Sequence, residues 1–181
     1  MYTTQPFPAL QFAASRGRTP DDLVLTPTGV RFRGRRYPCT IGRGGLSAAK
    51  REGDGATPLG EHRIVAMLYR PDRMARPAPW AVPIRPGDLW SDDPGQPDYN
   101  LLVSGPYPHS HEVMRRADPL YDLVLVSDWN WPVATPGKGS CIFLHQWRRP
   151  GYPTAGCVAL RPDHLRRIAA DVTPGTRLIV R

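Results

Sequence analysis

The chain has 181 residues, of which 40% are hydrophobic and 22% charged, as is usual for a globular domain that buries a sizeable core. No window approaches the ~18 apolar residues of a membrane span, and the 3 cysteines are too few and too scattered for a disulfide framework or a zinc cage. The net charge of +8 fits a nucleic acid, an anionic envelope polymer or a carboxylate-bearing peptide as partner, and equally a merely solvated basic surface.

A loose N-terminal arm, residues 1–20, is expected to precede a single domain, residues 21–181. The arm lacks the ingredients of a secretory signal, because no basic region precedes its apolar cluster and Pro6 and Pro8 interrupt that cluster. We therefore expect a cytoplasmic protein. A periplasmic location is the alternative if the start codon is misassigned.

The first half of the domain predicts short strands separated by structured loops. Residues 23–25 and 30–33 flank a Thr-Pro-Thr-Gly turn and predict a hairpin, which residues 37–45 continue as a further strand. A strand of about eight residues is expected at 62–69. The segment 71–108 is rich in proline and reads as a long irregular loop, which is uncommon in a compact domain unless it lines a site.

The second half predicts two buried strands, a helix and a final strand. The strands are expected within 121–130 and 141–145, and alternation in the second places Cys141, Phe143 and His145 on one face. The helix begins at Pro162, and its apolar positions follow the helical period at Leu165, Ile168, Ala169 and Val172. A last strand is expected at 176–181. The fold class is therefore mainly β, a single domain with one or two helices.

A thiol and an imidazole stand at the two ends of one loop. His145 ends an apolar run, and Cys157 follows Gly156 and opens another. The prolines and glycines between them force turns, so the loop can fold back and bring its ends together. A neighbouring imidazole can turn a thiol into the thiolate that nucleophilic catalysis needs, and amides beside Gly156 could stabilise an oxyanion. From spacing alone, a buried inert cysteine and a strand-capping histidine are the alternative.

The segment "GSCIFLHQWRRPGYPTAGCVAL" resembles the catalytic signature of the L,D-transpeptidase (YkuD-like) family, which runs from a histidine across a loop to Ser/Thr-x-Gly-Cys. The resemblance extends upstream through "IGRGGLSAAKREGDGATPLGEHRI", "LYRPDR", "WSDDPGQPDYN" and "LYDLVLV", which are similar to blocks of the compact branch of that family. It covers roughly residues 21–181 and implies a mainly β catalytic fold. We expect no cofactor and no metal.

The resemblance also implies the chemistry. Cys157 would attack the peptide bond between an L-configured centre and a D-amino acid in a peptidoglycan stem peptide, and form a thioester. His145 would keep Cys157 ionised and later protonate the leaving amine. Gly156 and Cys157 would offer amides to the oxyanion, and Thr154 would shape the turn.

The chain departs from the common family pattern around the cysteine, where Ala155, Val158 and Ala159 replace the usual His and Arg or Asn. We expect water to resolve the thioester, which makes the protein an L,D-carboxypeptidase of muropeptide recycling. A transpeptidase that cross-links peptidoglycan in the cell envelope is the alternative. A catalytically silent peptidoglycan-binding module is the alternative from another class.

Several further residues are candidates for binding the substrate, a peptidoglycan stem peptide or soluble muropeptide. Arg side chains can hold its free carboxylates bidentately, and aromatic side chains within the loop can line a cleft. The candidates are Arg148, Arg149, Arg73, Trp147 and Tyr152. We expect no nucleic acid partner and no insertion into a membrane. The sequence leaves open the oligomeric state and the roles of the blocks around Glu52, Asp92 and Asn100.

Two other motifs have both a functional and a structural interpretation. The motif "HSHE" at 109–112 could bind a metal if it is extended, because alternate residues such as His109 and His111 then share a face, although a surface loop beside two prolines is favoured because no third partner is in view. The basic run at 31–36 could contact phosphates. It also falls at a strand-to-turn edge, where Arg discourages sheet pairing, and we favour that interpretation.

Overall fold

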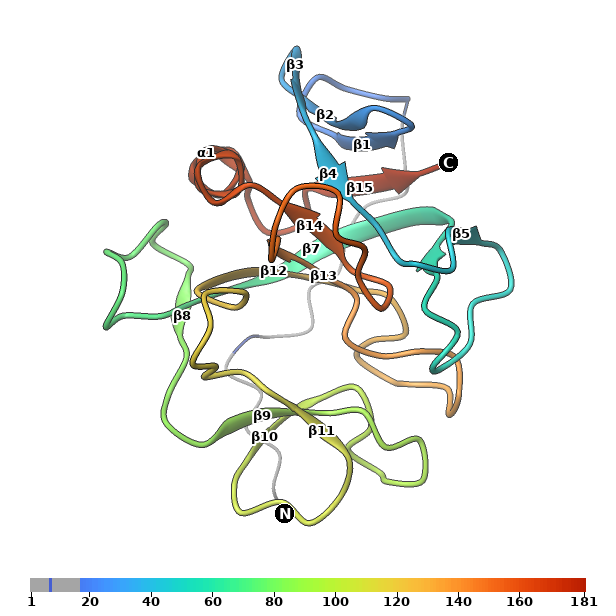
Figure 1. Ribbon diagram of the computed structural model, residues 1–181, viewed down its shortest axis with the longest axis vertical. Helices are drawn as coiled ribbons and strands as arrows, with labels where there is room; N and C mark the ends of the chain where they lie inside the picture. The colour runs from blue at the N-terminus through green and yellow to red at the C-terminus, as the bar shows by residue number, and fades with distance from the viewer. Residues whose placement is uncertain (1–6, 8–16) are drawn as a thin grey trace.

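A computed structural model describes residue 7 and residues 17–181 of the chain (Figure 1). Its frame is a ten-stranded sheet, nine strands of which follow one path while β8 (Val82–Pro83) pairs with β7 beside that path. The order along the path is β3 (Arg35–Tyr37), β2 (Gly29–Phe32), β1 (Leu23–Thr26), β15 (Arg177–Val180), β7 (Gly60–Tyr69), β12 (Leu123–Ser127), β13 (Phe143–Gln146), β14 (Val158–Leu160) and β4 (Cys39–Thr40).

The two ends of this path are joined by a single residue, because only Pro38 separates β3 from β4. The sheet therefore nearly closes on itself, and Figure 1 shows β3 running into β4. The sequence predicted one strand at 37–45, and this prediction is wrong in that the segment divides between opposite ends of the sheet. Proline has no N–H to donate to a ladder, so it suits the point where the chain leaves one set of pairings for another. β3 is an edge strand with Arg35 and Arg36 exposed, as predicted for the basic run.

The central strand β12 is buried along its whole length because both faces of the sheet are covered. Leu123 and Leu125 belong to one core cluster, and Val124 and Val126 belong to the other, as the alternation of a strand requires. The first cluster also contains the buried face of the helix. The predicted hairpin, the predicted strand at 62–69 and the buried strand within 121–130 are confirmed by β1–β2, β7 and β12.

A single helix, α1 (Pro162–Asp171), is present among the described residues. It begins at Pro162 as predicted, and Leu165, Ile168 and Ala169 face the core. The Val172 N–H donates to the Ile168 carbonyl and ends it. With 10 residues, the helix in the described part of the chain is far shorter than a membrane span of about 20 residues. The mainly β fold class is confirmed.

A second layer lies below the large sheet in Figure 1. It is a three-stranded sheet in the order β10 (Leu102–Ser104), β9 (Asp88–Ser91) and β11 (His111–Val113). The expectation of an irregular loop at 71–108 is therefore wrong where β8, β9 and β10 form, although most of this segment lies outside strands. The remaining strands, β5 (Leu46–Ser47) and β6 (Thr57–Pro58), form a short parallel pair.

The predicted arm falls mostly outside the described residues, which omit 1–6 and 8–16. Phe7 is described and is buried, with its ring 6.3 Å from that of Trp90 and 5.8 Å from that of Trp131. This ring therefore belongs to the core that joins the small sheet to the large one.

Candidate active site

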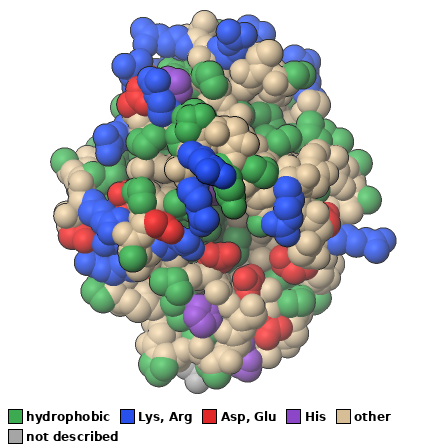
Figure 2. All heavy atoms as spheres, in the orientation of Figure 1, with side chains coloured by type: hydrophobic (Ala, Val, Ile, Leu, Met, Phe, Trp, Pro, Cys, Tyr) green, Lys and Arg blue, Asp and Glu red, His purple; other side chains and the backbone are tan. Residues whose placement is uncertain are grey.

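A cavity of about 390 Å³ opens between the large sheet and the small one. The Cys157 thiol and the His145 imidazole both line it. Charged side chains of both signs surround them, namely Arg43, Arg116 and Arg148 with Glu52, Asp92 and Glu112. Figure 2 shows side chains of both signs interleaved across the middle of one face of the molecule. Such a lining suits a small ligand that carries several charges.

The parallel pairing of β13 with β14 brings the two ends of the loop together. His145 stands opposite Ala159, and Leu144 stands opposite Val158. Leu144 and Val158 point into one core cluster, whereas Phe143 and Cys157 point into the other. By alternation, His145 and Cys157 are diagonal neighbours on the face that lines the cavity. The structure thus places these two predicted residues together.

The Cys157 sulfur is held between two backbone groups. Its Sγ donates to the Cys141 carbonyl at 2.9 Å, and the Phe143 N–H donates to Sγ at 3.4 Å. Cys157 is only 8% exposed, and burial raises the pKa of its thiol to about 12. Burial therefore favours the neutral thiol over the expected thiolate, whereas the hydrogen bond from the Phe143 N–H favours the anion.

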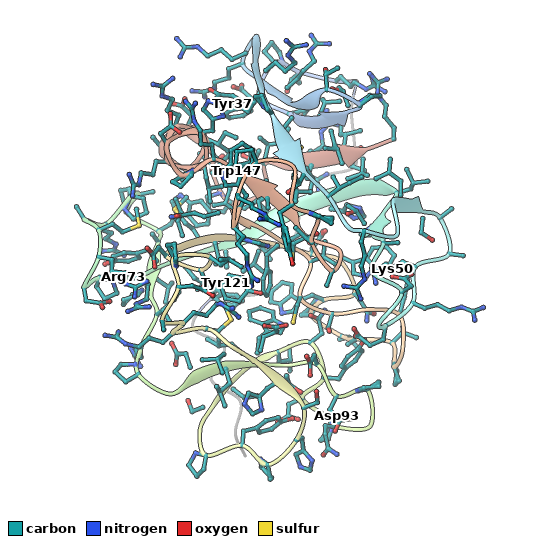
Figure 3. All side chains as sticks on the ribbon, in the orientation of Figure 1. Tyr37, Lys50, Arg73, Asp93, Tyr121 and Trp147 are labelled. Atoms are coloured by element: carbon teal, nitrogen blue, oxygen red, sulfur yellow. The ribbon has the colours of Figure 1, made fainter. Side chains whose placement is uncertain are left out.

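His145 is a neutral base in a defined tautomer. Its Nδ1 lies 2.8 Å from the Gln146 carbonyl oxygen, which can only accept, so Nδ1 carries the proton. Nε2 is then the unprotonated nitrogen, and no described residue binds its lone pair. Burial lowers the pKa of His145 to about 4, so the ring is neutral around pH 7. The Tyr121 ring meets it edge-on at 5.3 Å between centroids. Tyr121 lies centrally in Figure 3.

Gly156 sits where a side chain does not fit. Its φ of +144° is rarely adopted by L residues, and an added Cβ would lie 2.9 Å from the Ala56 carbonyl oxygen. Thr154 Oγ1 accepts the Gly156 N–H at 3.1 Å and donates to the Cys157 carbonyl at 2.6 Å. Thr154 therefore shapes the turn as expected. The Gly156 amide is already bound, so the Cys157 N–H is the better candidate for an oxyanion donor.

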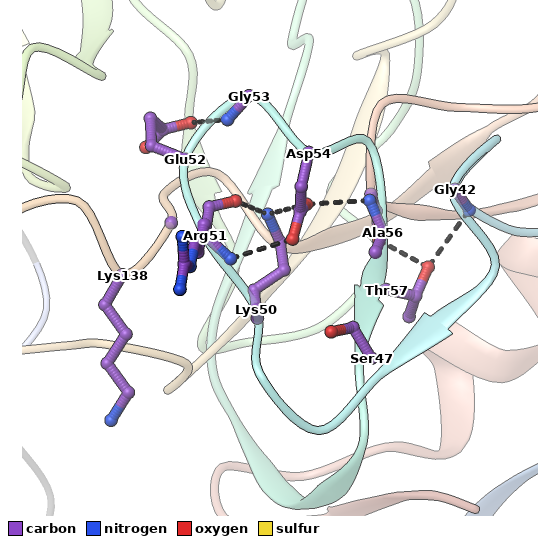
Figure 4. A network of polar contacts seen from close by, with 12 residues as sticks. Gly42, Ser47, Lys50, Arg51, Glu52, Gly53, Asp54, Ala56, Thr57 and Lys138 are labelled. Carbon is purple, nitrogen blue, oxygen red and sulfur yellow. Dashed lines mark hydrogen bonds and ion pairs between the residues drawn. The ribbon is translucent and has the colours of Figure 1, made fainter.

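The hydroxyl of Thr57, which is 99 residues away in the sequence, also binds this turn. Thr57 Oγ1 donates to the Gly156 carbonyl at 2.7 Å. It also accepts the Gly42 N–H at 3.0 Å, as Figure 4 shows. Gly42 also forms a parallel bridge with Thr154. The sequence did not predict Thr57 as a site residue. The one feature that could have pointed to it is its position in "GDGATP", part of a block that resembles the family.

The buried ammonium of Lys50 organises that block. Its Nζ donates to the Asp54 carboxylate at 2.7 Å and to the Arg51 carbonyl (Figure 4). Asp54 in turn accepts the Ala56 N–H at 2.8 Å. This ion pair therefore fixes the backbone just before Thr57. It gives a structural role to the lysine and the aspartate, which stand four residues apart in the sequence.

Two of the residues whose roles the sequence left open hold the segment before β13. Glu52 Oε2 accepts the hydroxyls of Tyr99 and Ser140, at 2.5 and 2.7 Å. Asn100 Oδ1 accepts the Cys141 N–H at 3.0 Å. Both contacts fix the backbone that leads to Cys141, whose carbonyl binds the Cys157 thiol.

The predicted substrate-binding residues divide into two groups. Arg148, Tyr152 and Thr154 line the cavity. Trp147, Arg149 and Arg73 do not line it. Arg73 instead binds Asp122 Oδ1 at 2.7 Å together with the Ala117 and Asp118 carbonyls, and Figure 3 shows it well away from Tyr121. Its role is structural, and the structure does not bring Arg73 of "RPDR" to the cavity.

Three carboxylates line the cavity, those of Glu52, Asp92 and Glu112, and none was predicted as a site residue. Burial and the neighbouring charge of Asp92 raise the pKa of Glu112. His109 and His111, which precede Glu112 in the candidate metal motif, pack their rings against Tyr107. Within the described part of the chain, no group of three or more His, Cys, Asp or Glu residues could hold a metal ion.

The chain was compared with known proteins. A family model described as the L,D-transpeptidase catalytic domain (YkuD) matches residues 23–180. No curated protein and no solved structure gives a significant match.

Proposed function

Because the chain belongs to the L,D-transpeptidase catalytic domain family, whose substrates derive from peptidoglycan, we propose that it transfers an acyl group from a stem peptide to water through Cys157. The observation that carries this proposal is the pairing of two groups in one cavity: a thiol, and an imidazole whose Nε2 lone pair is free. The product would be a stem peptide shortened by its terminal D-amino acid.

The reaction requires one proton to move twice. As the substrate enters, the Cys157 proton leaves the Cys141 carbonyl for His145 Nε2, and Sγ attacks the carbonyl carbon before the D-residue. The oxyanion then accepts a hydrogen bond from the Cys157 N–H. The His145 proton passes to the leaving amine, and the C–N bond breaks to leave a thioester.

Water completes the proposed cycle. His145 Nε2, neutral again, takes a proton from water as the oxygen attacks the thioester carbon. The C–S bond then breaks to release the acid, and His145 returns its proton to Sγ to restore the thiol and the neutral imidazole. The small side chains of Ala155 and Ala159 line the cavity, and they offer no hydrogen bond to an acceptor strand. This feature favours water over a second stem peptide.

Mass spectrometry of the purified protein mixed with a disaccharide-tetrapeptide tests the proposal. Hydrolysis gives a tripeptide product that has lost one alanine, and Cys157→Ala should give none while it keeps the wild-type fold. Dimers in excess of tripeptide would identify a transpeptidase. An unchanged substrate would favour a silent binding module.

The proposal includes a cytoplasmic site of action, where the substrates are soluble muropeptides. Cell fractionation with an antibody to the protein tests this point. Recovery in the periplasm would favour the cross-linking alternative, because polymeric peptidoglycan lies there.

A further inference from the structure

The side-chain amide of Asn100 has all of its hydrogen-bonding groups occupied. Its Oδ1 accepts the Cys141 N–H and the Trp90 Nε1–H, each at 3.0 Å. Its Nδ2 donates to the carbonyls of Trp129 and Asn130, at 3.0 and 2.8 Å. Asn100 is 3% exposed and has a φ of +59°, which Asn tolerates better than most residues. The side chain therefore has one defined orientation.

Cys141 connects this amide to the nucleophile through its backbone. Its N–H is held by Asn100, and its carbonyl accepts the Cys157 thiol at 2.9 Å. Cys141 has a φ of +54°, an uncommon conformation for a residue other than glycine, and surrounding contacts must maintain it. The hydrogen bond from its N–H to Asn100 is such a contact.

We propose that Asn100 is a positioning residue for the Cys157 thiol, because it holds the Cys141 peptide in the orientation that binds the thiol hydrogen. The inference rests on the proposed function in that it takes Cys157 as the nucleophile. With the acceptor fixed, Sγ has one favoured rotamer at the cavity wall, on the face shared with His145. Without Asn100, the Cys141 peptide relaxes and the thiol loses its acceptor.

The kinetic consequence falls on kcat. Asn100 does not line the cavity, so substrate affinity should change little. A misplaced nucleophile slows the chemical step, and a displacement of about 1 Å costs up to about 100-fold. A carbonyl that accepts the thiol hydrogen also stabilises the neutral thiol, so its loss makes the thiol more acidic.

The acidity of Cys157 also depends on its charged and titratable neighbours. Glu112 raises the thiol pKa and Lys50 lowers it, and Tyr121 and Cys141 interact with the thiol electrostatically. The remaining ionisable groups that line the cavity are His145, Glu52, Asp92, Arg43, Arg116, Arg148 and Tyr152. None of these is altered in the variants below, so a change in the alkylation profile reports on the Asn100 contact.

Asn100→Gly is the decisive variant, because glycine keeps the backbone conformation and removes the amide. Two readouts are needed: kcat and KM on the disaccharide-tetrapeptide, and the pH midpoint of Cys157 alkylation by iodoacetamide followed by peptide mass spectrometry. We expect kcat to fall about 100-fold with KM within about twofold. We expect the alkylation midpoint to shift to lower pH.

Two further variants separate positioning from stability. Trp90→Phe removes the other donor to the same oxygen, and it should lower the melting temperature without moving the alkylation midpoint. Asn100→Asp keeps an acceptor for the Cys141 N–H, so kcat should stay within about tenfold of wild type. Its added negative charge should leave the midpoint at or above the wild-type value, whereas general loosening would lower it.

The outcomes distinguish this inference from the proposed function. Wild-type kcat and midpoint in Asn100→Gly would overturn the inference, as would equal and large losses in Asn100→Gly and Asn100→Asp. If Asn100→Gly does not fold, a lowered midpoint in Asn100→Asp overturns it. Failure of the wild type to convert the tetrapeptide refutes the proposed function, while the alkylation midpoints, which need no substrate, still test Asn100.

Discussion

The Thr154 hydroxyl donates a 2.6 Å hydrogen bond to the carbonyl of Cys157, three residues further along the chain. The same oxygen accepts the Gly156 N–H. One hydroxyl thus closes the turn that presents the nucleophile, and it does so with a donor and an acceptor at once. Only serine or threonine supplies both from one short side chain.

Thr154→Val keeps the shape of the side chain and removes both hydrogen bonds. The Gly156 N–H and the Cys157 carbonyl lose their partner, which should cost about 1–3 kcal/mol of unfolding free energy. We expect turnover to fall at least about tenfold because the nucleophile is no longer held. Thr154→Ser should keep most of the stability, measured by urea unfolding, and most of the turnover, measured by tripeptide formation. Equal losses in the two variants would show that the methyl group, and not the hydroxyl, matters.

Gly156→Ala places a Cβ 2.9 Å from the Ala56 carbonyl oxygen and 3.2 Å from Ile142 Cδ1, at a φ of +144°. We expect a loss of more than about 2 kcal/mol of stability and of most activity, measured by thermal unfolding and turnover. Gly151→Asn is the matched control in the same loop, since Gly151 has a φ of +74° and an added Cβ meets nothing within 4 Å. Its stability should change by less than about 0.5 kcal/mol.

His145 should make both stability and activity depend on pH. Its pKa is lowered to about 4 in the folded protein from 6.5, so the unfolded chain binds the extra proton between these values. Stability is therefore full above pH 6.5 and is lost as the pH falls toward 4, by roughly 3 kcal/mol from this group. The acid limb of the pH profile of kcat/KM should therefore have its midpoint near the folded-state pKa of about 4.

Urea unfolding across pH 7 to 4 tests the prediction for His145 when wild type is compared with His145→Gln. The variant should lose less stability over this window. Burial also lowers the pKa of His62, so the variant keeps part of the slope. Identical slopes in both proteins would mean that His145 titrates normally.

Arg148 and Arg73 should differ in what their loss affects. Arg148 lines the cavity, where a carboxylate of the substrate can reach it, so Arg148→Gln should raise KM about tenfold and leave the fold intact. Arg73 is bound to Asp122 and two carbonyls, so Arg73→Gln should lower stability by on the order of 1 kcal/mol and leave KM unchanged. Steady-state kinetics and thermal unfolding of both variants decide between these roles.

The elements that could be predicted are those whose signal is local. The helix at α1 begins at its proline and follows the helical period through Ile168, and β12 is a continuous apolar run. The small sheet could not be predicted, because its central residue Trp90 pairs with Leu102 on one side and Glu112 on the other. Such pairings between segments of three or four residues are too short to leave a periodic pattern in the sequence.

The site shows the same division. Cys157 and His145 were identified from a motif within one loop. Thr57 reaches the turn across 99 residues and Asn100 reaches Cys141 across 41, so no spacing rule could associate them. The resting thiol was also not predictable, because the pKa of Cys157 depends on burial that only the packed structure reveals.

The small sheet links the wall of the cavity to the geometry of the nucleophile. β7 and β12 are adjacent antiparallel strands, and the segment that carries Asp92 and Glu112 leaves from one and returns to the other. The same segment carries Asn100, which binds the Cys141 N–H, and Trp90, whose ring packs edge-on against Phe143 beside Cys157. A change in this segment that reshapes the cavity wall would therefore also disturb the backbone that holds the thiol.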